Sequence, residues 1–229
     1  MENRRQMAQS LRTGVLLAAV GGFLESYTYL ARGGVFANCQ TGNLVLLVLS
    51  LAQGNMAAVW KYLVPVAAFF VGSLLALELR RRGDSLFLHW RQGLLCAEAV
   101  CLAGVALLPQ GSGDMAATTL VSFVCALQAS GFRVLHGKTY ASTMCTGNLR
   151  SLADCTHRLL HGGSSEDRRS ALRYAAIVLC FMGGAVLGAA LSWWLGRLAV
   201  LFSCVLLALA FVAMAAGTVS RQPAAARPE

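Results

Sequence analysis

Two short motifs of the same residue types occur in this chain, in an arrangement that could bind a solute. They are Gln40, Thr41, Gly42 and Asn43 in the first half, and Thr146, Gly147 and Asn148 in the second. Thr and Asn offer hydroxyl and amide groups, and Gly allows a turn or a close backbone approach. We predict that both motifs line a substrate-binding site. The alternative is that each motif only caps a short helix and packs the two halves together.

One acidic residue lies deep inside the apolar stretch that precedes the first motif. Glu25 stands fourteen residues after Leu11, roughly 21 Å along a helix. Ionisable groups at such depth are costly and mark functional sites, so Glu25 is a candidate for proton coupling. Two other readings stay open, a hydrated carboxylate near the membrane surface and a carboxylate paired with Arg32. The counterpart of Glu25 in the second half is Ser130.

Other residues within apolar stretches have simpler expected roles. Glu98 is expected to form an ion pair with Arg91 or Arg133, and Gln128 to hydrogen-bond between helices. Small residues at Gly72, Ser73, Gly183, Gly184 and Gly188 are expected to allow close helix packing.

Composition indicates the solvent in which these residues must fold. Of 229 residues, 57% are hydrophobic and 13% charged, whereas soluble domains are roughly 45–50% apolar and about 25% charged. Apolar stretches close to the ~20 residues of a membrane-crossing helix occupy residues 11–30, 59–79, 91–108, 115–135, 174–195 and 198–219. The first exceeds a signal-peptide core and has no convincing cleavage site after it, so it is predicted to remain as an anchor.

The net charge of +9 and the eight cysteines have plain explanations. The basic residues stand at the ends of apolar stretches, where they signal membrane topology, so no nucleic-acid partner is expected. No cysteine pair has Cys-x-x-Cys spacing, and we expect neither a metal nor a cofactor. The chain also lacks the sequence motifs of common hydrolases and of phosphate-binding loops, so it is not expected to be an enzyme.

The chain repeats itself. At an offset of 105 the two Thr-Gly-Asn motifs coincide, and Tyr27 falls on Phe132; at an offset of 112 Phe69 falls on Phe181 and Gly72 on Gly184. An insertion of seven residues in the polar loop 162–167 accounts for the change of offset. Each half therefore reads as a long helix, a break with a short helix, and two further long helices.

Charge decides whether the broken elements cross the membrane. If both are re-entrant and the N-terminus is cytoplasmic, only Arg32, Lys61 and Arg197 of the 19 Lys and Arg lie outside. If both cross, Arg32 and Arg197 stay outside and are joined there by Arg80–Arg82, Arg91, Arg133 and Lys138, and Arg150 lies within the membrane. The positive-inside rule therefore favours six spans over eight.

The predicted fold is an all-α integral membrane protein whose six transmembrane helices form two inverted three-span repeats, each with a broken or re-entrant element. The predicted boundaries are a cytoplasmic tail at 1–10, a first repeat at 11–108, a second at 115–219 and a cytoplasmic tail at 220–229. Inverted repeats with interrupted helices are the architecture of many secondary transporters.

The stretch from Gly21 to Leu44 resembles the signature of the YoaK family of bacterial inner-membrane proteins, a family of unknown function. The similarity is carried by residues 21–30, Gly33-Gly34-Val35-Phe36-Ala37-Asn38 and Gln40-Thr41-Gly42-Asn43-Leu44, and extends to near Gly217. The family commonly has Asp where this chain has Glu25. The resemblance implies a location in the bacterial plasma membrane and names no substrate.

Together these features favour a small-solute or ion transporter or channel, with membrane lipid and a small solute or ion as its partners. The alternative is a non-transporting scaffold or regulatory protein that acts through its cytoplasmic Arg-rich loops. Whether the chain forms a homo-oligomer is left open.

Overall fold

The computed structural model describes residues 11–82, 90–135 and 138–219. The two tails that the sequence predicts to be cytoplasmic, 1–10 and 220–229, lie outside the described residues, as does most of the predicted cytoplasmic loop 80–89.

The described chain is helical apart from one small hairpin. The helices are α2 (Leu11–Ala31), α3 (Gln40–Ala52), α4 (Met56–Arg82), α5 (Trp90–Leu107), α6 (Asp114–Gly131), α7 (Cys145–Leu160), α8 (Ser165–Leu195), the 3-10 turn η1 (Gly196–Ala199) and α9 (Val200–Val219). The hairpin pairs β1 (Val134–Leu135) with β2 (Lys138–Thr139) in antiparallel register. The structure therefore confirms a helical fold and adds a detail that the sequence did not predict.

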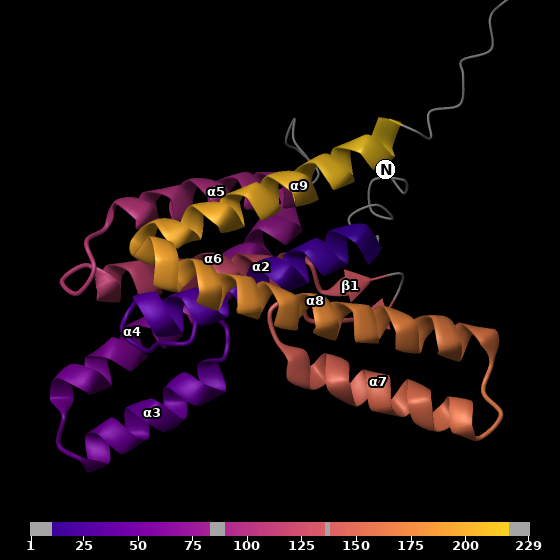
Figure 1. The fold of residues 1–229 in the computed structure, drawn as a ribbon, viewed down its shortest axis with the longest axis horizontal. Coiled ribbons are helices and arrows are strands. Elements are labelled where there is room, and N and C mark those ends of the chain that lie inside the picture. Colours follow the sequence, from indigo (N-terminus) through magenta and orange to yellow (C-terminus); the bar gives the residue numbers. More distant parts are fainter. Residues whose placement is uncertain (1–10, 83–89, 136–137, 220–229) are drawn as a thin grey trace, which may run out of the picture.

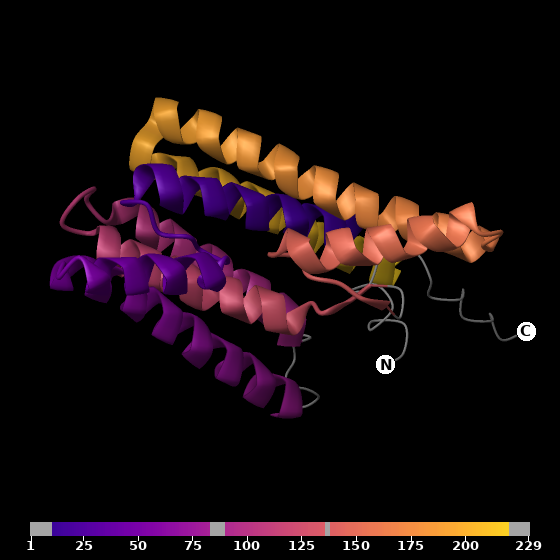
Figure 2. The same ribbon diagram turned by 90° about the horizontal axis from the view of Figure 1, so that it is seen from below.

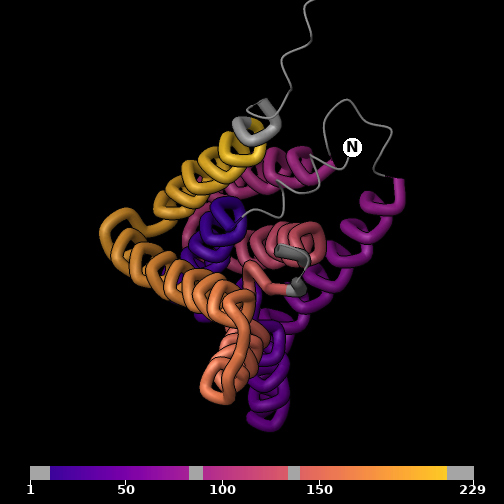
Figure 3. The backbone as a smooth tube through the Cα atoms, turned by 90° about the vertical axis from the view of Figure 1, so that its right-hand side faces the viewer, coloured from indigo at the N-terminus to yellow at the C-terminus, as the bar shows by residue number. Residues whose placement is uncertain are grey.

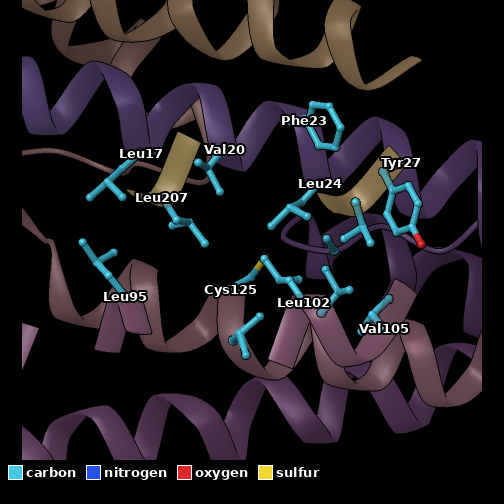
Figure 4. Close-up of a cluster of buried hydrophobic side chains, with 14 of the residues drawn as sticks. Leu17, Val20, Phe23, Leu24, Tyr27, Leu95, Leu102, Val105, Cys125 and Leu207 are labelled. Atoms are coloured by element: carbon cyan, nitrogen blue, oxygen red, sulfur yellow. The ribbon is translucent and has the colours of Figure 1, made fainter. Parts of the chain in front are cut away.

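Helix α2 lies at the centre of the bundle and is covered by α8 and α9, while α6 is covered by α4 and α5 (Figures 1 and 3). The main apolar core fills the space between α2, α5, α6 and α9. Leu24 of α2, Leu102 of α5, Cys125 of α6 and Leu207 of α9 meet there (Figure 4). Close packing of this kind gives the van der Waals contacts that hold helices together within a membrane.

The short helices α3 and α7 follow a different path. Both begin near the middle of the bundle, and they run toward its opposite ends (Figure 2). Helix α3 returns to the end where α2 finishes and then packs on α4, whereas α7 returns to the end where α6 finishes and packs on α8. The loop after α7 closes with a capping box, in which the Ser164 hydroxyl accepts from Asp167 N–H and the Asp167 carboxylate from Ser164 N–H. That box starts α8 at a defined residue.

Close glycine contacts tie the helices together, as the sequence predicted. A Cβ added at Gly184 of α8 would lie 2.0 Å from the Ala19 carbonyl of α2, and one at Gly72 of α4 would lie 2.5 Å from the Phe123 carbonyl of α6. Gly188 meets α2 in the same way. Gly183 faces open space, so the packing prediction is wrong for that residue.

Four helical stretches in the described residues are long and apolar enough to cross a membrane: Leu11–Ala31, Met56–Arg82, Trp90–Leu107 and Ser165–Ala215. The last stretch covers two of the predicted spans. The predicted span 115–135 is not among them, because α6 carries polar residues such as Thr118, Ser122 and Gln128. All three are buried in protein rather than facing the surroundings.

Candidate functional site

The first break is held in shape by the side chain of Asn43. Its Oδ1 accepts a hydrogen bond from the Phe36 N–H at 3.0 Å, and its Nδ2 donates to the Phe36 carbonyl at 2.8 Å. The second amide hydrogen goes to Oε1 of Gln40 at 2.9 Å. Asn43 is fully buried, so these bonds satisfy backbone groups that would otherwise be orphaned within the protein.

Asn148 clamps the second break with the same geometry. Its Oδ1 accepts from the Ala141 N–H at 3.1 Å, and its Nδ2 donates to the Ala141 carbonyl at 2.6 Å and to the Met144 carbonyl at 3.2 Å. In both breaks the asparagine grips the backbone of the residue seven positions earlier. Both asparagines therefore shape the break, and their predicted contact with substrate stays a prediction.

The remaining motif residues lie around the starts of the two short helices. The Nε2 of Gln40 donates to the Ala37 carbonyl at 2.9 Å. Thr41 and Thr146 are exposed, as is Gly147, whose Cα has open space around it. Gly42 is packed instead, because an added Cβ would lie 2.9 Å from the Phe36 ring. The structure thus brings both motifs to helix starts but leaves their hydroxyl groups on the surface.

The side-chain carboxylate of Glu25, a residue of α2, lies at the start of α3. Its Oε2 accepts from the Asn38 N–H at 2.8 Å and from the Asn38 side chain at 3.2 Å, and its Oε1 accepts from the Cys39 N–H at 3.1 Å. The first N–H groups of a helix are orphaned and carry a partial positive charge, so a carboxylate there is stabilised.

The two breaks meet on the same stretch of α2. The Asn38 side chain donates to the Gly21 carbonyl at 3.2 Å, and a Cβ added at Gly21 would lie 2.7 Å from the Ser142 carbonyl. Gln128 of α6 joins the group, because its Nε2 donates to the Leu17 carbonyl at 3.1 Å and to the Ser142 hydroxyl at 3.2 Å. The predicted interhelical hydrogen bonding of Gln128 is confirmed.

Arg32 forms hydrogen bonds and an ion pair with other residues, and Glu25 is not among them. Arg32 is fully buried and donates to Tyr27, to Asp114 and to the backbone carbonyls at the end of α5, of which Val105 is the nearest at 2.8 Å. The suggested pairing of Glu25 with Arg32 is therefore wrong. Arg32 instead satisfies orphaned carbonyls at a helix C-terminus, where a cation is favourable.

Glu98 also departs from the sequence prediction. It is 1% exposed, and its Oε1 has no hydrogen-bond partner among the described residues. Arg133 is exposed, and Arg91 donates from Nε to the Gly131 carbonyl at 3.0 Å. The predicted ion pair of Glu98 does not form within the described part of the chain.

The residues that sequence reasoning missed are Asn38 and Ser142. Each stands in a break, before the recognised motif, and contacts α2 or α6. A signal was available for Asn38, because it is a polar residue five positions before Asn43 in a stretch that must fold back on the preceding helix.

Comparison with known proteins places this arrangement in a family. The model of the family DUF1275, described as "Protein of unknown function (DUF1275)", matches residues 13–213. The chain belongs to the DUF1275 family. It is also similar to the UPF0700 transmembrane protein YoaK of Bacillus subtilis (strain 168), with 28% identity over 182 residues that cover 76% of this chain and 81% of that protein. No solved structure matches the chain.

The DUF1275 match confirms the resemblance noted from the first break and supports a multi-pass membrane protein with a bacterial transmembrane relative. The matched range includes both asparagine clamps, Glu25 and Glu98. The DUF1275 description names no substrate, so function has to be argued from the site itself.

Proposed function

We propose that this protein is a small-solute or ion transporter or channel of the bacterial plasma membrane, and not an enzyme. Its six spans form two inverted repeats, with α3 and α7 entering the membrane from opposite faces and both chain termini in the cytoplasm. The observation that carries the proposal is that the N-terminal ends of α3 and α7 both lie near the middle of the bundle and face each other (Figures 1 and 2).

Exchanged packing between the halves supports the inverted repeat. Helix α8 of the second half packs on α2 of the first, and α4 of the first packs on α6 of the second. The glycine contacts follow the same exchange, since Gly72 and Gly184 are counterparts in the sequence and each meets a carbonyl on the other half. The matching clamps of Asn43 and Asn148 add a third correspondence.

The exposed helix starts support a hydrated path. Cys39, Thr41 and Thr146 are exposed at the starts of α3 and α7, and both helix starts lie near the middle of the bundle (Figure 2). Irregular backbone and polar groups at membrane depth survive only against protein or water, because lipid offers no hydrogen-bond partner. The positive ends of two half-helices that meet at the midplane form a site of the kind that secondary transporters use for polar or anionic groups.

In this proposal the residues divide the work. Asn43 and Asn148 hold the breaks in shape, and the segments Gln40–Thr41 and Thr146–Gly147, of which only Gln40 is partly buried, contact the solute. Glu25 supplies a negative charge that offsets the positive end of α3. Protonation of Glu25 would remove that charge, leave the helix end uncompensated and so link proton binding to solute binding.

The test is accessibility of single cysteines on a background in which all eight native cysteines are replaced. Thr41→Cys and Thr146→Cys are treated with a charged thiol reagent that does not cross lipid. Both are expected to react, whereas Val186→Cys in α8, a residue 68% exposed next to the equally apolar and exposed Met182, is expected to stay unmodified against lipid. Solute flux is then measured in proteoliposomes against a panel of ions and metabolites, before and after modification.

A packed, dry centre would overturn the proposal. If Thr41→Cys and Thr146→Cys fold normally, yet neither reacts and no solute in the panel is transported, the protein does not form a solute path. That result would favour a membrane scaffold that acts through its Arg-rich loops.

A further inference from the structure

Helix α8 is longer than a bilayer needs. The stretch 174–194 carries no charged residue and, at 1.5 Å per residue, is about 30 Å long, which matches the hydrocarbon core of a membrane. The whole helix has 31 residues, so its first turns, 165–173, extend beyond that stretch. With the end of α7 they form an arm that projects past the start of α2 (Figures 1 and 2).

Exposed apolar side chains form one stripe along α8. They are spaced by three, four or seven residues and are between 57% and 68% exposed: Leu172, Leu179, Met182 and Val186. Residues at such spacings lie on one face of a helix. At its far end the stripe reaches Trp193 and Trp194, which are 77% and 87% exposed. Because Trp prefers the membrane boundary, the stripe is the face that α8 turns to lipid.

Two arginines continue the stripe at the opposite end, on the arm. Arg168 and Arg169 stand four and three residues before Leu172, so they lie on the same face of the helix. Both are exposed, and within the described ranges neither side chain forms a hydrogen bond or an ion pair. Their positive charges are therefore available to a partner outside the chain.

The other charged residues of the arm are engaged elsewhere. Arg158 of α7 pairs with Asp167 at 2.7 Å, and Arg173 pairs with Glu166 at 3.2 Å. The remaining carboxylate of the arm, Asp154 of α7, forms no ion pair in the part of the chain that the structure describes. The acidic residues thus neutralise two other arginines and leave the charged end of the stripe positive.

We propose that this end of α8 binds an anionic phospholipid. The guanidinium groups of Arg168 and Arg169 bind the headgroup phosphate, whose oxygens match their paired donors, and the acyl chains lie along the apolar stripe. The two arginines stand roughly 8–9 Å beyond the stretch 174–194, at the level of the headgroups, and their long side chains can reach back toward the phosphate.

The continuity of the two features favours a lipid over an acidic protein. A soluble partner would have a use for the arginines alone, whereas a phospholipid uses the positive end and the apolar stripe together. This inference rests on the membrane arrangement in the proposed function and not on solute transport. A lipid bound along α8 also stabilises the helix that covers α2, so binding is expected to raise the melting temperature.

The test uses the purified full-length protein after removal of bound lipid, in detergent. Dioleoyl phosphatidylglycerol and dioleoyl phosphatidylcholine, which have identical chains, are titrated separately, and bound lipid is counted by native mass spectrometry beside a melting curve. The wild type is expected to bind phosphatidylglycerol more tightly and to melt at a higher temperature with it. Arg168→Gln combined with Arg169→Gln is expected to weaken that binding roughly twenty-five-fold, about fivefold for each basic residue.

The matched control removes two positive charges from another helix end. Arg81→Gln combined with Arg82→Gln changes the last turn of α4, where both guanidinium groups pair with Glu78 at 2.7 and 2.6 Å. This variant is expected to keep the affinity of the wild type. An equal loss in both double variants would show a general attraction between charges and would overturn the proposed site.

Two further outcomes would also overturn it. One is equal affinity of the wild type for the two lipids. The other is full competition by glycerol phosphate at the same concentration, because a site for a small anion needs no acyl chains. Lipid binding is counted without any measurement of flux, so its failure would leave the proposed solute path intact. A protein that binds phosphatidylglycerol through Arg168 and Arg169 but transports no solute would refute the proposed function alone.

Discussion

The two breaks share one device and differ in another. In each, an asparagine side chain grips the backbone seven residues earlier, so the chain can fold back before a short helix begins. Only the first has a carboxylate at its helix start, where Glu25 accepts from Asn38 and Cys39, while the second half has Ser130 in that place. The asparagine clamps therefore satisfy backbone groups in both breaks. Glu25, which has no carboxylate counterpart in the second half, is the candidate for a role in coupling.

The largest expected effect comes from replacing the two clamping asparagines. Asn43→Leu and Asn148→Leu each keep the side-chain size but leave a buried N–H and a carbonyl unpaired, at about 1–3 kcal/mol for each group. Both variants should melt at clearly lower temperature in detergent. Asn43 should be the more sensitive position for transport, because it lies in the half that carries Glu25.

The same preparations distinguish clamping from substrate binding. Flux per folded molecule is measured beside the melting curve, with Gln53→Leu, in the exposed turn after α3, as the control. Normal flux per folded molecule in both clamp variants would limit Asn43 and Asn148 to a structural role. Loss of flux at an unchanged melting temperature would refute the clamp account and support direct contact with the solute.

A smaller effect is expected from replacing Glu25, which has no acidic counterpart in the second half. Glu25→Gln loses a charge-assisted acceptor at the start of α3, a type of bond worth about 1.5–3 kcal/mol. Ser130→Ala in the second half should change stability by less than about 0.5 kcal/mol. Chemical denaturation in mild detergent can compare the two. Equal losses at both positions would show that the halves do not differ in the way described.

The smallest expected effect tests the packing that joins the halves. Gly184→Ala would place a methyl group against the Ala19 carbonyl and should cost roughly 1–3 kcal/mol. Gly183→Ala, one residue away in open space, should be neutral or stabilise by up to about 1 kcal/mol through its higher helix propensity. Similar melting temperatures for the two variants would contradict the close approach of α8 to α2.

The sequence predicted the helices and both breaks but not the partners within the site. Apolar length and the Thr-Gly-Asn repeat are local patterns, so α2, α3 and α7 could be located from them. Most partners of Arg32 lie more than 70 positions away, and the burial of Glu98 depends on the helices that pack on α5. A single sequence does not show such proximity. Arg32 was expected on the outer side of the membrane, with a pairing to Glu25 as one alternative, and the structure instead buries it against the end of α5.

The hairpin of β1 and β2 and the role of Asn38 were not predicted, for a related reason. Both depend on how the chain turns after α2 and α6, and the breaks contain several residues that could make either turn. Gln128 was predicted correctly because a polar residue inside an apolar helix must find a hydrogen-bond partner on a neighbouring helix.

The most direct test of the central claim is the side of the membrane on which each short helix ends. Asn55→Cys, just after α3, and His161→Cys, at the exposed end of α7, are placed singly on a cysteine-free background and treated with an impermeant thiol reagent in intact cells. If α3 and α7 enter from opposite faces, the reagent labels Asn55→Cys from outside and labels His161→Cys only after the cells are opened. Protection of Asn55→Cys in intact cells, with labelling after opening, would show that α3 crosses the bilayer and would contradict the inverted six-span arrangement.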